Sequence, residues 1–199
     1  MDQKMKNITI ALLCTASVVL ATAPAHAESP FTTGPFVGLS LGGVGLMPRT
    51  IGLVNTGESE HDNGAAKLTA GYWFSPHWGF AASYVDMGEF TQTYNSGSFS
   101  GSVRSAGLGL LGRVAINDRW SLIGKVTLTH NRSKQTSVTG DPIQFSELRG
   151  ESTQAVWPGL EINYKVNEAA SVFFEAESRG EAAEKLDTAY GGIGLRWQF

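Results

Sequence analysis

The chain has 199 residues and a formal net charge of −3, from 15 basic and 18 acidic side chains. This length suits one domain, and the acidic balance argues against nucleic acid as a partner. Its single cysteine excludes an intrachain disulfide and a cysteine-based metal site.

The N-terminal segment has the pattern of a secretory signal peptide. Two lysines precede an apolar run over 8–21, and the small-x-small sequence Ala-His-Ala follows at 25–27. The apolar run is shorter than the roughly 20 residues that a transmembrane helix needs. We therefore predict a cleaved signal peptide over 1–27, which directs export, and one mature domain over 28–199.

The mature chain contains eight stretches in which apolar and polar residues alternate with period two, and none with a sustained helical period. This pattern predicts antiparallel strands joined in chain order, which close into a barrel because closure leaves no free sheet edge. The predicted strands are 34–46, 64–74, 78–88, 101–116, 120–130, 153–166, 170–180 and 188–199.

The predicted connections alternate in length. The tight turns are 75–77, 117–119 and 167–169; the long polar links are 47–63, 89–100 and 131–152; and the link 181–187 is intermediate. Short turns at one end and long loops at the other are typical of bacterial outer-membrane barrels, whose turns face the periplasm. The predicted fold class is all-β, an eight-stranded antiparallel up-and-down transmembrane β-barrel.

Alternation alone does not distinguish this fold from a soluble lipocalin-like barrel, which shows the same alternation with the faces reversed; the aromatic residues do. The apolar parity carries aromatic residues close to the short-turn end of the strands. Amphipathic rings at one level are expected at a membrane interface. The predicted aromatic girdle consists of Phe74, Trp78, Trp120, Tyr164, Trp197 and Phe199.

The opposite parity places charged side chains inside the barrel, where an unpaired charge is costly. Lys125, Glu161 and Glu175 each lie about five residues from a short turn on neighbouring strands, and so at a similar height. We predict that Lys125 bridges the two carboxylates. Arg113, Glu177 and Arg196 are expected to extend this ion-pair network. A closed structural plug is the favoured interpretation, because eight strands leave an interior that side chains just fill.

Three sequence stretches carry a resemblance to a known family: GPFVGLSLGG at 34–43, AGYWFSPHWGF at 70–80 and WSLIGKV at 120–126, together with the terminal Phe199. With these the mature chain resembles the eight-stranded domain of outer membrane protein A and its small relatives of the OmpX and opacity type. The resemblance implies contact with outer-membrane lipids and lipopolysaccharide. It also implies insertion by the barrel-assembly machinery through the C-terminal strand that ends in Phe199. Outer membrane protein A itself continues into a peptidoglycan-binding domain, which we do not expect in this chain.

Enzyme-like motifs are present but lack their structural context. GLGLLG at 107–112 matches the dinucleotide fingerprint, and GLSLG at 38–42 matches the nucleophile elbow of hydrolases. Both lie in predicted strands without the helix that these motifs require. His130, Ser133 and Asp86 lie near the loop end, where a lipid-modifying rim enzyme would place such groups, but they form no recognisable constellation by spacing. We predict no enzyme, no cofactor and no metal site.

The predicted function is therefore that of a monomeric integral outer-membrane protein of a Gram-negative envelope. Its role is structural and interactive, in membrane integrity or in adhesion through the long loops to an unknown surface ligand. Arg104, Arg132 and Lys134, near the outer rim, are candidates for contact with lipopolysaccharide phosphates. A narrow, low-conductance porin-like channel is the main alternative, in which the ion pairs of the network exchange partners to open a path.

Overall fold

The structure is a computed structural model that describes residues 31–48, 64–94, 97–140, 152–183 and 186–199. The predicted signal peptide lies outside these residues, as does most of the predicted loop over 47–63. The strands are β1 Gly34–Pro48, β2 Gly64–Trp73, β3 Trp78–Tyr94, β4 Gly97–Ala115, β5 Trp120–Gly140, β6 Ser152–Lys165, β7 Ala170–Ala183 and β8 Leu186–Gln198.

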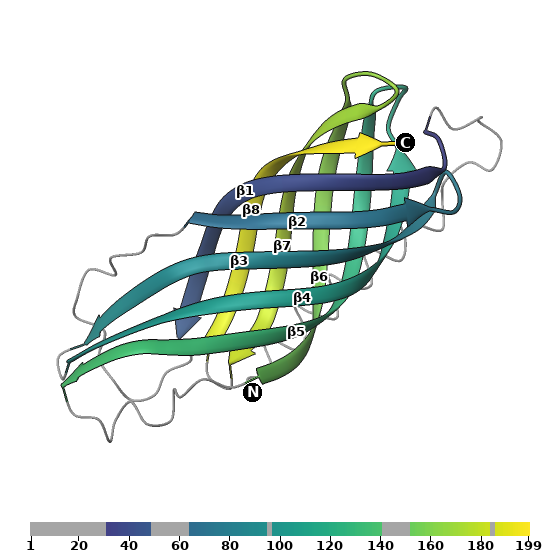
Figure 1. Cartoon of the computed structure of the whole chain (residues 1–199). Helices are drawn as coiled ribbons and strands as arrows, with labels where there is room; N and C mark the ends of the chain where they lie inside the picture. The colour runs from purple at the N-terminus through teal and green to yellow at the C-terminus, as the bar shows by residue number, and fades with distance from the viewer. Residues whose placement is uncertain (1–30, 49–63, 95–96, 141–151, 184–185) are drawn as a thin grey trace.

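The eight strands form a closed barrel in which each strand pairs antiparallel with its neighbours in chain order and β1 pairs with β8 (Figure 1). The predicted fold class is confirmed. None of the described residues belongs to a helix that is long and apolar enough to cross a membrane.

Three strands are much longer than predicted. β3 continues to Tyr94, β4 begins at Gly97 and β5 continues to Gly140. Most of the loop predicted over 89–100 is therefore strand, as are residues 131–140 of the loop predicted over 131–152, of which 141–151 lie outside the described residues. The prediction was wrong here because these extensions are rich in serine and threonine on both faces, which removes the period-two signal while threonine still favours extended backbone. In Figure 1 the three strands reach beyond the others at the end opposite the C-terminus.

The three short turns use one hydrogen-bonding arrangement. Asn117 Oδ1 accepts the backbone N–H groups two and three residues ahead, at 2.9 Å each, and Asn167 Oδ1 does so at 2.9 and 2.8 Å. Ser75 Oγ has the same role in the first turn, at 3.3 and 2.9 Å. A side chain that bonds its own turn fixes the geometry locally. The register of each hairpin is thereby set at its short end.

Large apolar side chains cover the outside of the barrel, and every strand contributes to them. One example from each strand, between 47% and 69% exposed, is Leu41, Leu68, Phe80, Leu108, Leu128, Leu160, Phe174 and Ile193. An apolar surface this extensive needs an apolar partner. Because the charged side chains lie inside, these faces are those of a barrel in lipid and not those of a lipocalin.

The lumen near the short turns is filled by an apolar cluster of Phe36, Trp73, Ala81, Leu111 and Ile123, all buried. The rings of Phe36 and Trp73 have centroids 5.7 Å apart. These residues occupy inward parity, so apolar side chains fill much of the interior at this level, while carboxylates and lysines lie further along the strands.

The seam between β1 and β8 is built from glycines. Gly42 pairs with Gly192, and Gly43 pairs with Gly191. A Cβ atom at Gly42 would lie 2.1 Å from the backbone oxygen of Gly191, which is shorter than any real contact. Closure therefore depends on the close approach of two backbones at this point.

We expect Gly42→Ala to lower the free energy of unfolding by about 1–3 kcal/mol, because the seam must shift to admit a methyl group. Gly45→Ala is the matched control on the same strand, since a Cβ there meets no atom within 4 Å. Urea unfolding of the barrel in lipid vesicles, followed by its mobility on unheated SDS gels, measures both variants. Equal stability of the two variants would contradict a tight seam.

Candidate functional site

Three carboxylates face the lumen from two adjacent strands. Glu161 lies on β6, and Glu175 and Glu177 lie on β7; Glu161 and Glu175 are direct cross-strand partners. Their exposed fractions are 0%, 5% and 6%. Like charges placed opposite each other and out of water repel, so this arrangement requires cations beside it.

Lys125, from β5, provides one of these cations. Its Nζ lies 3.0 Å from Glu161 Oε2, 2.5 Å from Glu175 Oε2 and 3.5 Å from Glu177 Oε1. On β6 the cross-strand partner of Lys125 is Gly159. A Cβ at Gly159 would lie 2.7 Å from Glu177 Cγ, so the glycine leaves room for the side chains that meet here. The structure thus places Lys125 between the two carboxylates that the sequence assigned to it.

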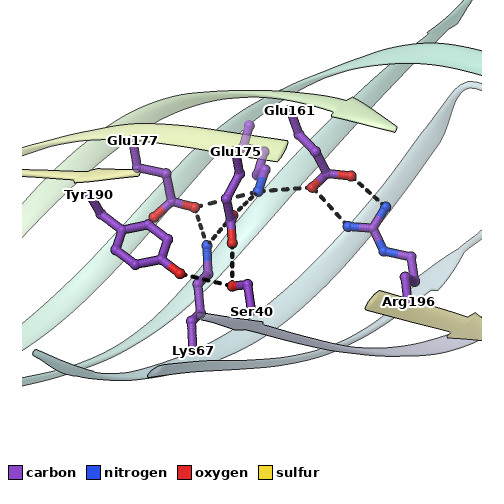
Figure 2. Close-up of polar contacts among 8 residues, drawn as sticks. Ser40, Lys67, Glu161, Glu175, Glu177, Tyr190 and Arg196 are labelled. Atoms are coloured by element: carbon purple, nitrogen blue, oxygen red, sulfur yellow. Dashed lines mark hydrogen bonds and ion pairs between the residues drawn. The ribbon is translucent and has the colours of Figure 1, made fainter. Parts of the chain in front are cut away.

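Lys67, from β2, provides the second cation by crossing the lumen. Its Nζ lies 2.7 Å from Glu175 Oε2 and also pairs with Glu177. Ser40 Oγ donates to Glu175 Oε1 at 2.6 Å and lies 2.9 Å from the Tyr190 hydroxyl. Figure 2 shows these side chains converging from different strands. Sequence reasoning missed the role of Lys67, because heights compared along neighbouring strands do not reveal a contact across the barrel.

Arg196, from β8, completes the set through Glu161. Its Nη1 and Nη2 donate to Oε1 and Oε2 of this carboxylate at 2.7 and 2.8 Å, a bidentate pair (Figure 2). The guanidinium also lies 4.9 Å from the Phe36 ring centroid and 4.8 Å from that of Phe173. Arg196 therefore connects the charged level of the lumen to the rings beside it.

Three cations and three carboxylates together form what we call the ion-pair lattice: Lys67, Lys125, Arg196, Glu161, Glu175 and Glu177. No side chain in it is more than 9% exposed. The lattice is formally neutral and joins β2, β5, β6, β7 and β8. Such a buried arrangement is stable only while every charge keeps its partners.

Arg113 lies apart from this lattice. Its guanidinium carbon is 3.6 Å from the Trp73 ring centroid and 4.9 Å from that of Phe31. The structure shows no ion pair between Arg113 and any residue that it describes. The sequence expected Arg113 in the network because its parity is inward, but parity gives no information on which neighbour the side chain contacts.

The six residues of the predicted aromatic girdle lie on the outer surface at the short-turn end. Five are exposed and Tyr164 is half-buried. Trp120 and Tyr164 are cross-strand partners with ring centroids 4.8 Å apart. Tyr72 and Phe80, which the sequence reasoning left out, are exposed on the same side and stack at 6.2 Å.

The enzyme-like motifs have structural roles. In the first, Gly107 lies within β4, where a Cβ would lie 2.8 Å from a methyl group of Thr127. In the second, Ser40 donates its hydroxyl to Glu175 of the lattice. At the rim, Asp86 pairs with Arg104 at 3.0 Å, while His130 is exposed on the outer face of β5. The side chain of Ser133 lies outside the described residues.

We expect Lys125→Met to lower the free energy of unfolding by about 3–5 kcal/mol, because buried carboxylates lose the cation that they share. Arg104→Gln removes an exposed ion pair and is the matched control, with an expected change below about 1 kcal/mol. Urea titration followed by tryptophan fluorescence measures both. If the Lys125→Met variant is as stable as the parent, the ion pairs between Lys125 and the buried carboxylates do not stabilise the barrel.

The comparisons with known proteins agree with this architecture. The family described as outer membrane protein beta-barrel domain matches residues 12–199. Comparison with curated proteins gives no match. Among solved structures, Ail of Yersinia pestis is 13% identical, with 85% of this chain and 100% of that chain covered and a TM-score of 0.54. Neisserial surface protein A is 14% identical, with 83% and 97% covered and a TM-score of 0.56.

A third structure, the N-terminal β-barrel domain of Pseudomonas aeruginosa OprF, is 12% identical, with 84% and 100% covered and a TM-score of 0.52. At these identities the structural likeness shows the fold alone. The family match, which spans nearly the whole chain, establishes more. This chain belongs to the outer membrane protein β-barrel domain family, whose place is the outer membrane of the cell.

Proposed function

We propose that this protein is a closed structural barrel of the outer membrane that stabilises the membrane by contact with lipopolysaccharide. The closed state is supported by the neutral ion-pair lattice, which fills the lumen at one level. The apolar cluster around Phe36 and Trp73 fills it at another. An ion crossing the barrel would have to displace both.

A narrow channel is the second candidate, and one contact favours it. Glu175 Oε2 lies within 2.7 Å of both Lys67 and Lys125. One lysine can therefore leave this carboxylate while the other keeps it paired, which lowers the cost of rearrangement. A channel opened in this way would have a low conductance, because the strand number limits the bore.

The wild-type barrel is expected to show no conductance steps in planar bilayers. The double variant Lys125→Ser with Glu175→Ser keeps the ion-pair lattice neutral while it removes two long side chains, so it is expected to conduct. Single-channel recording measures both proteins after an SDS gel has shown that each is folded. Regular openings of the wild-type protein would reject the closed barrel in favour of the channel.

The proposed contact with lipopolysaccharide rests on an outer basic patch, which we define as Arg104, Arg132 and Lys134. All three are exposed on the outward face of β4 and β5. Arg104 and Arg132 are direct cross-strand partners, and Lys134 lies two residues further along β5. Like charges in this position destabilise a sheet unless an anion lies between them.

The location of the patch indicates which anion it would bind. Along the same outward faces, Leu108 and Leu128 lie nearer the short turns and are well exposed to lipid. The patch therefore follows directly on the apolar belt, at the level of lipid headgroups. Asp86 balances one of its charges through Arg104. The remaining positive charge suits the phosphates of lipid A, because arginine binds phosphate with two parallel hydrogen bonds.

Neutralising the patch with Arg104→Gln, Arg132→Gln and Lys134→Gln is expected to weaken lipid A binding at least tenfold. Native mass spectrometry of the barrel in detergent, titrated with lipid A, measures the bound fraction. Arg119→Gln, at a short turn, is the control and is expected to bind as the parent does. Binding of dephosphorylated lipid A as tight as that of lipid A would exclude phosphate recognition.

The remaining partners follow from the two ends of the barrel. We infer that the assembly machinery recognises β8 together with Phe199, the residue that follows it. Phe199 donates its backbone N–H to the Pro35 carbonyl at 2.9 Å and leaves its ring exposed. At the other end, the surface that we propose for adhesion is formed by the extended ends of β3, β4 and β5 and by the long predicted loops that follow them. The predicted aromatic girdle is proposed to anchor the barrel at the periplasmic interface, and the barrel is proposed to be a monomer.

A further inference from the structure

Arg113 adds a buried positive charge that the ion-pair lattice does not balance. Its exposed fraction is 4%, and its Nε and Nη1 atoms have no hydrogen-bond partner among the residues that the structure describes. The lattice already uses all three of its carboxylates for Lys67, Lys125 and Arg196. A buried guanidinium with open donors requires a partner of some kind.

The groups around Arg113 do not fully satisfy its hydrogen-bond donors and its charge. Trp73 and Phe31 offer the faces of their rings, which attract the cation but accept no hydrogen bond from donors in the guanidinium plane. Arg196 is a like charge nearby, and its own Nε is also buried with no hydrogen-bond partner in the described part of the chain. Glu161 attracts Arg113 from a distance, but both of its oxygens are bonded to Arg196.

A small cavity at the short-turn mouth of the lumen is lined in part by Arg113 and Arg196. Its volume is about 20 Å³, and Lys165 and Asn163 also contribute to its lining. This is room for one or two waters or for a monoatomic ion. Glu168 also lines the cavity, but this residue is exposed on a turn and its carboxylate is not paired with Arg113.

The segment before β1 lines one side of this cavity. Phe31 is buried, and Thr32 is held in place by Gln198 Nε2, which donates to the Thr32 carbonyl and to its hydroxyl at 2.8 Å each. The cavity therefore lies at the periplasmic mouth, partly open to solvent, with two arginines on its wall.

We propose that this cavity is a binding site for a small monovalent anion of the halide type, held by Arg113 and Arg196. A halide fits the volume, accepts hydrogen bonds from several donors at once and neutralises the surplus charge. A water molecule would accept hydrogen bonds from the donors but would leave the positive charge of Arg113 unbalanced. The site is independent of the proposed closed state and of the outer basic patch, so it stands whether or not the barrel conducts.

The direct test is a crystal of the wild-type protein grown in sodium bromide, with data collected at the bromine absorption edge. An anomalous peak within hydrogen-bond distance of Arg113 and Arg196 is expected. Absence of a peak there, or a carboxylate of the chain in that position, would overturn the proposal. This measurement needs no variant.

The second test compares thermal unfolding in chloride and in gluconate at equal ionic strength, read from the heat-dependent shift on SDS gels. The wild-type midpoint is expected to be higher in chloride by a few degrees, and Arg113→Gln is expected to lose this difference. Arg119→Gln, which changes an exposed arginine at a short turn outside the cavity lining and outside the outer basic patch, should retain it. The same chloride dependence in all three proteins would refute a site at Arg113.

Discussion

Closure of β1 onto β8 is the constraint on which every other feature of this protein depends. In hydrocarbon, backbone N–H and C=O groups have no water to bond, so each must find a partner within the sheet. Eight strands meet this demand by forming a ring, and the glycines at the seam allow the first and last strands to approach. Once the ring is closed, every second side chain points into a lumen whose width is set by the strand number.

The narrow lumen explains why charged residues lie there in so ordered a manner. A single carboxylate placed inside would be unstable, but Glu161, Glu175 and Glu177 are surrounded by three cations from other strands. The lattice also specifies register. A shift of one residue in β6 would carry Glu161 to the lipid face, where no partner exists. The charges therefore help to select one alignment of the strands, in addition to filling space.

Much of this architecture follows from the sequence, because a membrane barrel separates its two faces by strict alternation. The parity of Lys125, Glu161 and Glu175 and their distance from the short turns were sufficient to bring them to one level. Lys67 has inward parity but was not assigned to the network, because its contact runs across the lumen and depends on the curvature of the closed sheet. The extended ends of β3, β4 and β5 were missed because both faces of a strand are polar once it leaves the membrane.

Arg113 illustrates a different limit. Its parity and charge are visible in the sequence, yet its position over Trp73 depends on side-chain packing that no spacing rule describes. Aromatic rings at inward positions resemble lipid-facing rings in composition, and only their parity separates the two. The apolar filling of the lumen near the short turns is therefore harder to predict than its charged filling.

The contact between Lys67 and β7 has a mechanical consequence. Lysine and carboxylate here join two strands that are not neighbours, and so form a chord across the ring. A ring held only by bonds between adjacent strands can flatten under lateral pressure from the surrounding lipid, whereas a chord opposes that deformation. The cross-section of this barrel should thus be stiffest along the line from β2 to β7.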